Sequence, residues 1–135
     1  MALDIQQRER EGIIILKLDG RITMGPESGQ LRDKINALNE AGKRNVVLDM
    51  AEVDYIDSTG LGALVMCSTT LRRNQGVLKL LNLNRRAAEL LVMTKLATVF
   101  EIFNDEQDAV DSFYPDRKVK TFDILSFVQQ MKNEE

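Results

Sequence analysis

The apolar and polar positions at the start of the chain follow the two-residue repeat of β-strands. A first strand is predicted over residues 3–10, with Leu3 on its apolar face. A second strand is predicted over residues 13–18, a β-branched run with apolar residues at the even positions. Between them, Glu11 and Gly12 favour a tight turn, because glycine adopts positive φ without strain. The pattern therefore predicts an N-terminal β-hairpin.

After the hairpin, helical and strand patterns alternate along the chain. Helices are predicted between Pro26 and Gly42, from Ser58 to about Asn74, after a cap at Asn84 and after a cap at Asp105. Strands are predicted near residues 46–50, 77–81 and 99–103. Such alternation implies right-handed crossovers and a largely parallel sheet. Because the hairpin adds an antiparallel pair, we expect an α/β fold with a mixed sheet.

The alternation stops near residue 114, where Pro115 and the charged residues that follow it indicate a linker. Residues 121–132 then form an amphipathic segment. Its apolar side contains Ile124, Phe127, Val128 and Met131, with Leu125 at the edge. We expect a helix with this side buried, because a lone helix of this length is marginal in water. Packing on its own domain, exchange between two copies in a homodimer and docking onto a partner all remain open.

Composition excludes several classes of function. The chain has 135 residues, a net charge of −3, one cysteine and no histidine. Without histidine, a Ser-His or Cys-His pair cannot form, and most metal sites lose a common ligand, so we expect no enzyme, cofactor or metal. The mixed charge argues against nucleic acid as a partner. No apolar stretch reaches the roughly 20 residues of a membrane span, and no leader pattern begins the chain, so we expect a cytoplasmic protein.

A short polar turn, Asp-Ser-Thr-Gly at residues 57–60, precedes the second predicted helix. Ser58 stands at or next to the helix N-cap, where its hydroxyl can accept hydrogen bonds from backbone N–H groups. Most turns of this kind cap a helix and do nothing more, so a purely structural interpretation competes with a functional one. The glycines do not complete a phosphate-binding loop, because the Gly-Lys-Ser/Thr ending is missing.

Helical spacing divides the residues after this turn among three faces. The core face is predicted to hold Leu61, Leu64, Val65, Ser68 and Leu71. The small residues that allow close approach to a neighbour are Gly60, Ala63 and Cys67. The face left for solvent or a partner holds Thr59, Gly62, Met66, Thr69 and Arg73. A lone cysteine on the small-residue stripe favours a packing role over a reactive thiol.

Four motifs resemble the STAS family, the domain of sulfate transporters and anti-sigma factor antagonists. They are Leu-Asp-Gly-Arg-Ile at 18–22, Val-Val-Leu-Asp at 46–49, Asp-Ser-Thr-Gly-Leu-Gly at 57–62 and Leu-Lys-Leu at 78–80. Free-standing antagonists look most similar, and the resemblance covers residues 3 to about 113. It implies a mixed sheet with helices mostly on one face, here followed by an extra C-terminal helix. We therefore divide the chain into a STAS-like domain (1–114) and a linker with a helix (115–135).

The resemblance also implies a mechanism. Antagonists of this family bind an anti-sigma factor that is a serine kinase, and phosphorylation of the antagonist ends the binding. The phosphorylated serine maps onto Ser58, and Asp57 matches the motif aspartate that presents the hydroxyl. The motif and the helix face that the core does not use together predict the kinase- and partner-binding residues, which are Asp57, Thr59, Gly60, Gly62, Met66, Thr69 and Arg73. Thr23 stands where many members carry an acidic residue.

Two other functions stay open at this point. The same fold could serve as a STAS subunit of a lipid-transport or stress-sensing complex that is never phosphorylated. A small-ligand or nucleotide-binding module could instead use the turn from Asp57 to Gly60.

Overall fold

The computed structural model describes residues 3–23 and 25–134, and within these ranges five strands form one sheet. The strands are β1 (Asp4–Arg10), β2 (Ile13–Ile22), β3 (Asn45–Ile56), β4 (Val77–Leu81) and β5 (Ile102–Phe103). They lie side by side in chain order, with β1 antiparallel to β2 and every other pair parallel. The predicted mixed sheet is therefore confirmed. Glu11 and Gly12 form the hairpin turn, both with positive φ, as a tight two-residue turn requires.

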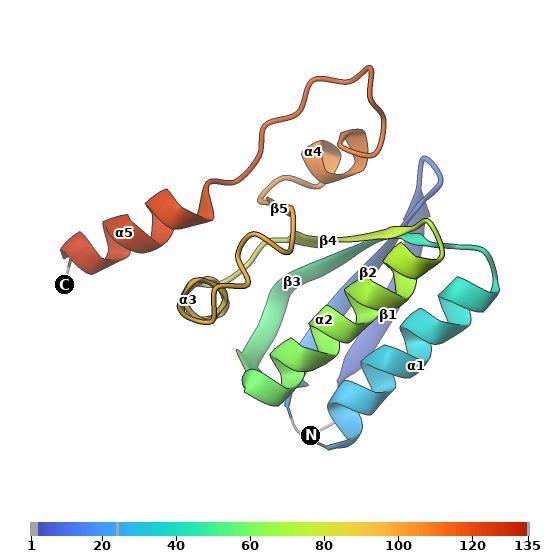
Figure 1. The fold of residues 1–135 in the computed structure, drawn as a ribbon, viewed down its shortest axis with the longest axis horizontal. Helices are drawn as coiled ribbons and strands as arrows, with labels where there is room; N and C mark the ends of the chain where they lie inside the picture. The colour runs from blue at the N-terminus through green and yellow to red at the C-terminus, as the bar shows by residue number, and fades with distance from the viewer. Residues whose placement is uncertain (1–2, 24, 135) are drawn as a thin grey trace.

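The helices are α1 (Pro26–Glu40), α2 (Ser58–Arg73), α3 (Arg85–Met93), α4 (Glu106–Asp111) and α5 (Ile124–Glu134). Helices α1 and α2 lie next to each other across one face of the sheet (Figure 1). The buried residues of α3 and α5 belong to the same core as those of α1 and α2, whereas α4 packs into a separate cluster on the other face. The expectation that helices lie mostly on one face is confirmed.

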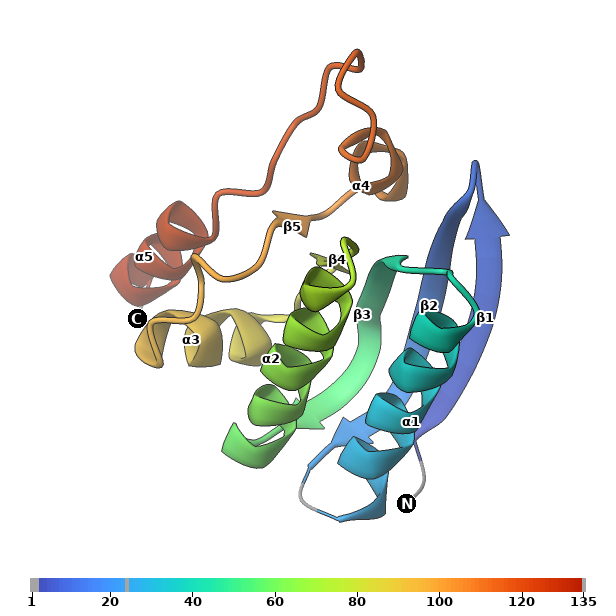
Figure 2. The same ribbon diagram turned by 45° about the vertical axis from the view of Figure 1, so that its right-hand side comes forward.

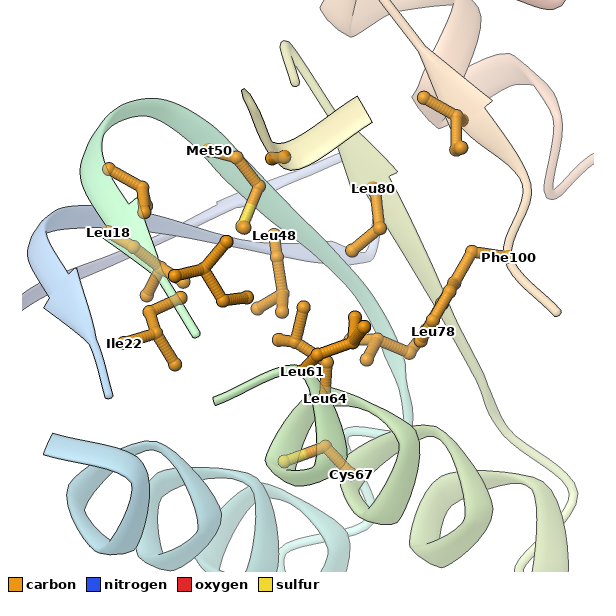
Figure 3. Close-up of a cluster of buried hydrophobic side chains, with 14 of the residues drawn as sticks. Leu18, Ile22, Leu48, Met50, Leu61, Leu64, Cys67, Leu78, Leu80 and Phe100 are labelled. Carbon is orange, nitrogen blue, oxygen red and sulfur yellow. The ribbon is translucent and has the colours of Figure 1, made fainter. Parts of the chain in front are cut away.

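The alternation along β2 divides its side chains between the two cores. Ile14, Leu16 and Leu18 enter the larger core, whereas Ile13 and Ile15 enter the smaller core under α4. In Figure 3, Leu61 and Leu64 of α2 are directed toward the sheet. Each fully buried leucine or isoleucine contributes about 1.5–3 kcal/mol by leaving water, so these contacts hold α2 against the sheet.

Three strands differ in length from their prediction. Strand β2 continues to Ile22 rather than ending at residue 18. Strand β3 continues to Ile56 rather than ending near Met50, because β2 pairs with it up to Ile22. Strand β5 is limited to Ile102–Phe103, because Val99 N–H bonds to Leu96 O in a turn after α3. The added length of β2 and β3 arises from pairing between distant segments, which a local pattern does not contain, whereas the start of β5 is limited by a local turn.

The C-terminal segment folds back onto its own chain. Helix α5 lies beside α3 (Figure 2), and Ile124, Val128 and Met131 are buried in the larger core. The prediction of a buried apolar face is confirmed, although Leu125 is 60% exposed. The helix begins at residue 124 rather than 121. Just before it, an Asp123 carboxylate oxygen accepts a hydrogen bond from Ser126 N–H at 3.1 Å. The division at residue 114 and a homodimer through this helix remain predictions.

Candidate functional site at the start of helix α2

Asp57 caps the helix that begins at Ser58. Its side chain accepts a hydrogen bond from Gly60 N–H at 2.8 Å, and its backbone is extended, with φ −105° and ψ −178°. Ser58 is therefore the first helical residue. The sequence predicts Ser58 either at the N-cap or next to it. The structure places it next to the N-cap, which is Asp57. A stabilisation of about 1 kcal/mol from capping belongs to Asp57.

The same turn is attached to the end of β2. Asp57 N–H donates to Ile22 O at 3.4 Å. Gly60 lies so close to that carbonyl that an added Cβ would be 1.8 Å from Ile22 O. The predicted close approach at the small-residue stripe therefore occurs here, and it requires glycine. Because Gly60 is buried, it can contribute to a partner surface only by shaping the turn.

The predicted partner face emerges at this turn. Ser58, Thr59 and Gly62 are exposed, and Met66 is 55% exposed although it is a large apolar residue. Further along α2, Arg73 is exposed, whereas Thr69 is half-buried and its hydroxyl donates to Val65 O at 3.0 Å. The predicted partner face is therefore exposed from Ser58 to Met66, and its exposure decreases at Thr69.

Helix α1 contributes to this surface as well. A shallow hollow between the two helices is lined by Ser28, Arg32, Thr59, Gly62, Ala63 and Met66. Ser28 and Arg32 are not indicated by the sequence, because nothing in a single sequence shows which face of α1 lies beside α2. Thr23, just before α1, accepts a hydrogen bond from the Ser28 hydroxyl through its backbone carbonyl.

Cys67 lies on the inner side of α2. Burial raises the pKa of its thiol to about 12, because the thiolate would lose its hydration. The thiol therefore stays protonated and acts as a small apolar group, as predicted. Within the described ranges, no group of three or more Cys, Asp or Glu side chains is placed to hold a metal ion.

A sequence profile of the STAS domain matches residues 4–109. The chain belongs to the STAS domain family. The match includes the whole sheet and helices α1 to α3, and it ends before α5.

Named relatives of this STAS protein come from several bacteria. The anti-sigma-B factor antagonist of Bacillus subtilis is 30% identical over 102 residues, which cover 76% of this chain and 92% of that protein. The anti-sigma-B factor antagonist of Listeria monocytogenes is 42% identical over 66 residues, covering 47% of this chain and 58% of that one.

Solved structures confirm the fold. An anti-sigma factor antagonist from Mycobacterium paratuberculosis matches 82% of this chain and 92% of its own, with a TM-score of 0.72 and 19% identity. The Bacillus cell fate determinant SpoIIAA in its phosphorylated form matches 82% of this chain and 99% of its own, with a TM-score of 0.64 and 19% identity. Among the described helices of this STAS protein, none is both long and apolar enough to cross a bilayer.

Proposed function

We propose that this STAS protein is an anti-sigma factor antagonist that is switched by phosphorylation of Ser58. It binds an anti-sigma factor with serine kinase activity, and the phosphate ends the binding. The observation that carries the proposal is the exposed hydroxyl of Ser58 at the first position of α2, beside the Asp57 cap. Relatives named as antagonists that align with most of the STAS region support it.

The position of Ser58 suits a phosphate-controlled switch. A phosphate adds about −1.5 to −2 charges, and a helix N-terminus favours negative charge. The fold should therefore tolerate the modification. A partner pressed against the same turn would have to bury an unmatched charge, which costs about 2–5 kcal/mol, or roughly 30- to 4000-fold in affinity.

The test is binding to the purified cognate anti-sigma factor by calorimetry, with and without ATP. Ser58→Asp should weaken the complex at least 30-fold, and Ser58→Ala should bind and resist release by ATP. Thr98→Asp is the matched control, since Thr98 is an exposed hydroxyl residue in the turn after α3. Equal affinities for Ser58→Asp and Ser58→Ala would refute the switch. Phosphopeptide mapping should find the phosphate on Ser58, and modification confined to Thr59 would count against the proposal.

The face that begins at Ser58 is the proposed contact surface. Met66→Glu places a charge at its centre and should weaken the complex while leaving the melting temperature nearly unchanged, because Met66 is 55% exposed. A charge at exposed Gln7, on the edge strand β1, provides the control. If Gln7→Glu weakens binding as much as Met66→Glu, the contact surface lies elsewhere.

A further inference from the structure

Two arginines from different elements meet over one aromatic ring close to Ser58. The Arg21 guanidinium carbon lies 5.8 Å from the centroid of the Tyr55 ring, and that of Arg86 lies 4.9 Å from it. Both distances are in the range of cation–π attraction. We name these three residues the arginine–tyrosine cluster.

The backbone fixes Arg21 beside the Ser58 turn. The β2–β3 register shifts between Gly20 and Arg21, and Gly20 has a φ of 123°, which favours glycine. Arg21 then pairs with Tyr55 across the strands. The next residue, Ile22, is the one whose carbonyl accepts Asp57 N–H.

Arg86 reaches the same place from α3. Asn84, the cap of α3, donates through its side-chain amide to Val53 O at 2.8 Å, which ties the start of α3 to β3. Arg86 is in the first turn of that helix. The cluster therefore joins the ends of β2 and β3 to the start of α3, and Tyr55 lies three residues before Ser58.

The charges of the cluster are not neutralised within the described ranges. Across residues 3–23 and 25–134, neither Arg21 nor Arg86 forms an ion pair, whereas the adjacent Arg85 pairs with Glu89 at 3.5 Å. Both arginines are exposed. A guanidinium that is near a ring and forms no ion pair has N–H groups that can make a bidentate contact with a carboxylate. Arginine and tyrosine are also the residue types enriched at energetic centres of interfaces.

We propose that the arginine–tyrosine cluster binds a carboxylate-bearing segment of the anti-sigma factor, with Tyr55 as the positioning residue for both guanidinium groups. This inference rests on the proposed function and adds the chemistry of the partner's contact. Because Tyr55 lies three residues before Ser58, a phosphate on Ser58 would add negative charge near the same end of the sheet.

The first test compares charge-neutral variants in the same calorimetric assay. Arg21→Gln and Arg86→Gln should each weaken the complex roughly tenfold, and Lys118→Gln, which removes one exposed charge from the linker, should leave it unchanged. Tyr55→Phe keeps the ring and should keep the affinity, whereas Tyr55→Ala should lose it. Added salt should weaken the wild-type complex more steeply than the complex of the double arginine variant. Melting temperatures of all variants identify any loss due to unfolding.

The outcomes separate this inference from the proposed function. If the arginine variants bind as well as Lys118→Gln while Ser58→Asp still blocks binding, the cluster is not the contact and the function stands. If no anti-sigma factor binds, the function fails, and a hexaglutamate peptide becomes the probe of the cluster. Arginine side-chain NMR signals of Arg21 and Arg86 should then shift more than that of Arg73. Equal shifts, or none, would overturn the inference.

Discussion

The turn that carries Ser58 is held by one side-chain cap and one close backbone contact, whereas the junction between the hairpin and α4 is held by several ion pairs. At the turn, one carboxylate caps the helix and one glycine allows close contact with β2. At the junction, Arg8 and Arg10 both pair with Glu106 of α4. Arg117 bridges Glu11 at 2.9 Å and Asp111 at 2.8 Å.

The α4 side of the sheet also contains a buried lysine. Lys79 Nζ donates to the Ser112 hydroxyl at 2.8 Å and lies 2.8 Å from a carboxylate oxygen of Glu101. It also lies 4.3 Å from the centroid of the Phe113 ring. The cation has partners on several sides, as a buried charge requires.

The difference between the Ser58 turn and the α4 junction determines where a new charge can be added without loss of the fold. The turn is held by Asp57 and Gly60, whereas Ser58 is exposed, so a new charge at Ser58 changes the outer surface without breaking the cap. At the junction, a new negative charge would compete for the arginines that hold α4 in place. The contrast leads to four predictions about the variants that should damage each region.

Gly60→Ala should give the largest loss of stability, about 3 kcal/mol, because the new Cβ would lie 1.8 Å from a backbone oxygen that cannot move alone. Gly62→Ala, two residues on, has nothing within 4 Å of its Cβ and should stabilise α2 by up to about 1 kcal/mol. Urea unfolding of both variants and of wild type measures the two changes in unfolding free energy. Similar losses in both would mean that the close approach to β2 is absent.

Lys79→Met should cost about 1–3 kcal/mol, because it removes the hydrogen bonds to Ser112 and the pair with Glu101 while keeping the length of the side chain. Lys17→Met, at an exposed position of β2, should change the free energy of unfolding by less than about 0.5 kcal/mol. Thermal unfolding of the two variants makes the comparison. A neutral Lys79→Met would show that packing rather than charge dominates this side of the sheet.

Local patterns predicted much of the fold because the forces involved are local. The caps at Asn84 and Asp105 are confirmed, each accepting from the backbone N–H three residues later. The ends of β2 and β3 depend on their pairing with each other, and no local window of the sequence contains that information.

Some features of the candidate site follow from local sequence, and others depend on the tertiary fold. An exposed hydroxyl at the start of α2 follows from the sequence around Ser58. The identity of the cap does not, because Asp57 and Ser58 are both good cap residues and only the backbone angles distinguish them. Arg86 is 28 positions from Ser58 in the chain, and only the tertiary fold brings α3 to the end of β3.

Asp57→Ala should cost about 1 kcal/mol through the lost cap, whereas Ser58→Ala should change stability by less than about 0.5 kcal/mol. Asp57→Asn keeps a side-chain oxygen for Gly60 N–H and should retain most of the stability. Chemical denaturation of the three variants ranks them. If Ser58→Ala is the most damaging, the cap has been assigned to the wrong residue.

Glu106→Gln should reveal the acid sensitivity of the junction, with the smallest effect of the four. Hydrogen bonds from Arg8, followed by those from Arg10, hold the pKa of Glu106 at about 2, below its ordinary value of 4.5. A carboxyl with a lowered folded-state pKa stabilises the fold above pH 4.5, and that contribution is lost as the pH falls toward 2. Solvent screening limits this stabilisation to less than about 1 kcal/mol.

The Glu106→Gln variant should therefore be less stable than wild type at pH 7. The difference in unfolding free energy between the two proteins should decrease on acidification and at high salt. Glu40→Gln, at an exposed position of α1, should show no such narrowing in urea unfolding measured from pH 7 to pH 3. A constant gap for Glu106→Gln across that range would show that these ion pairs do not stabilise the junction.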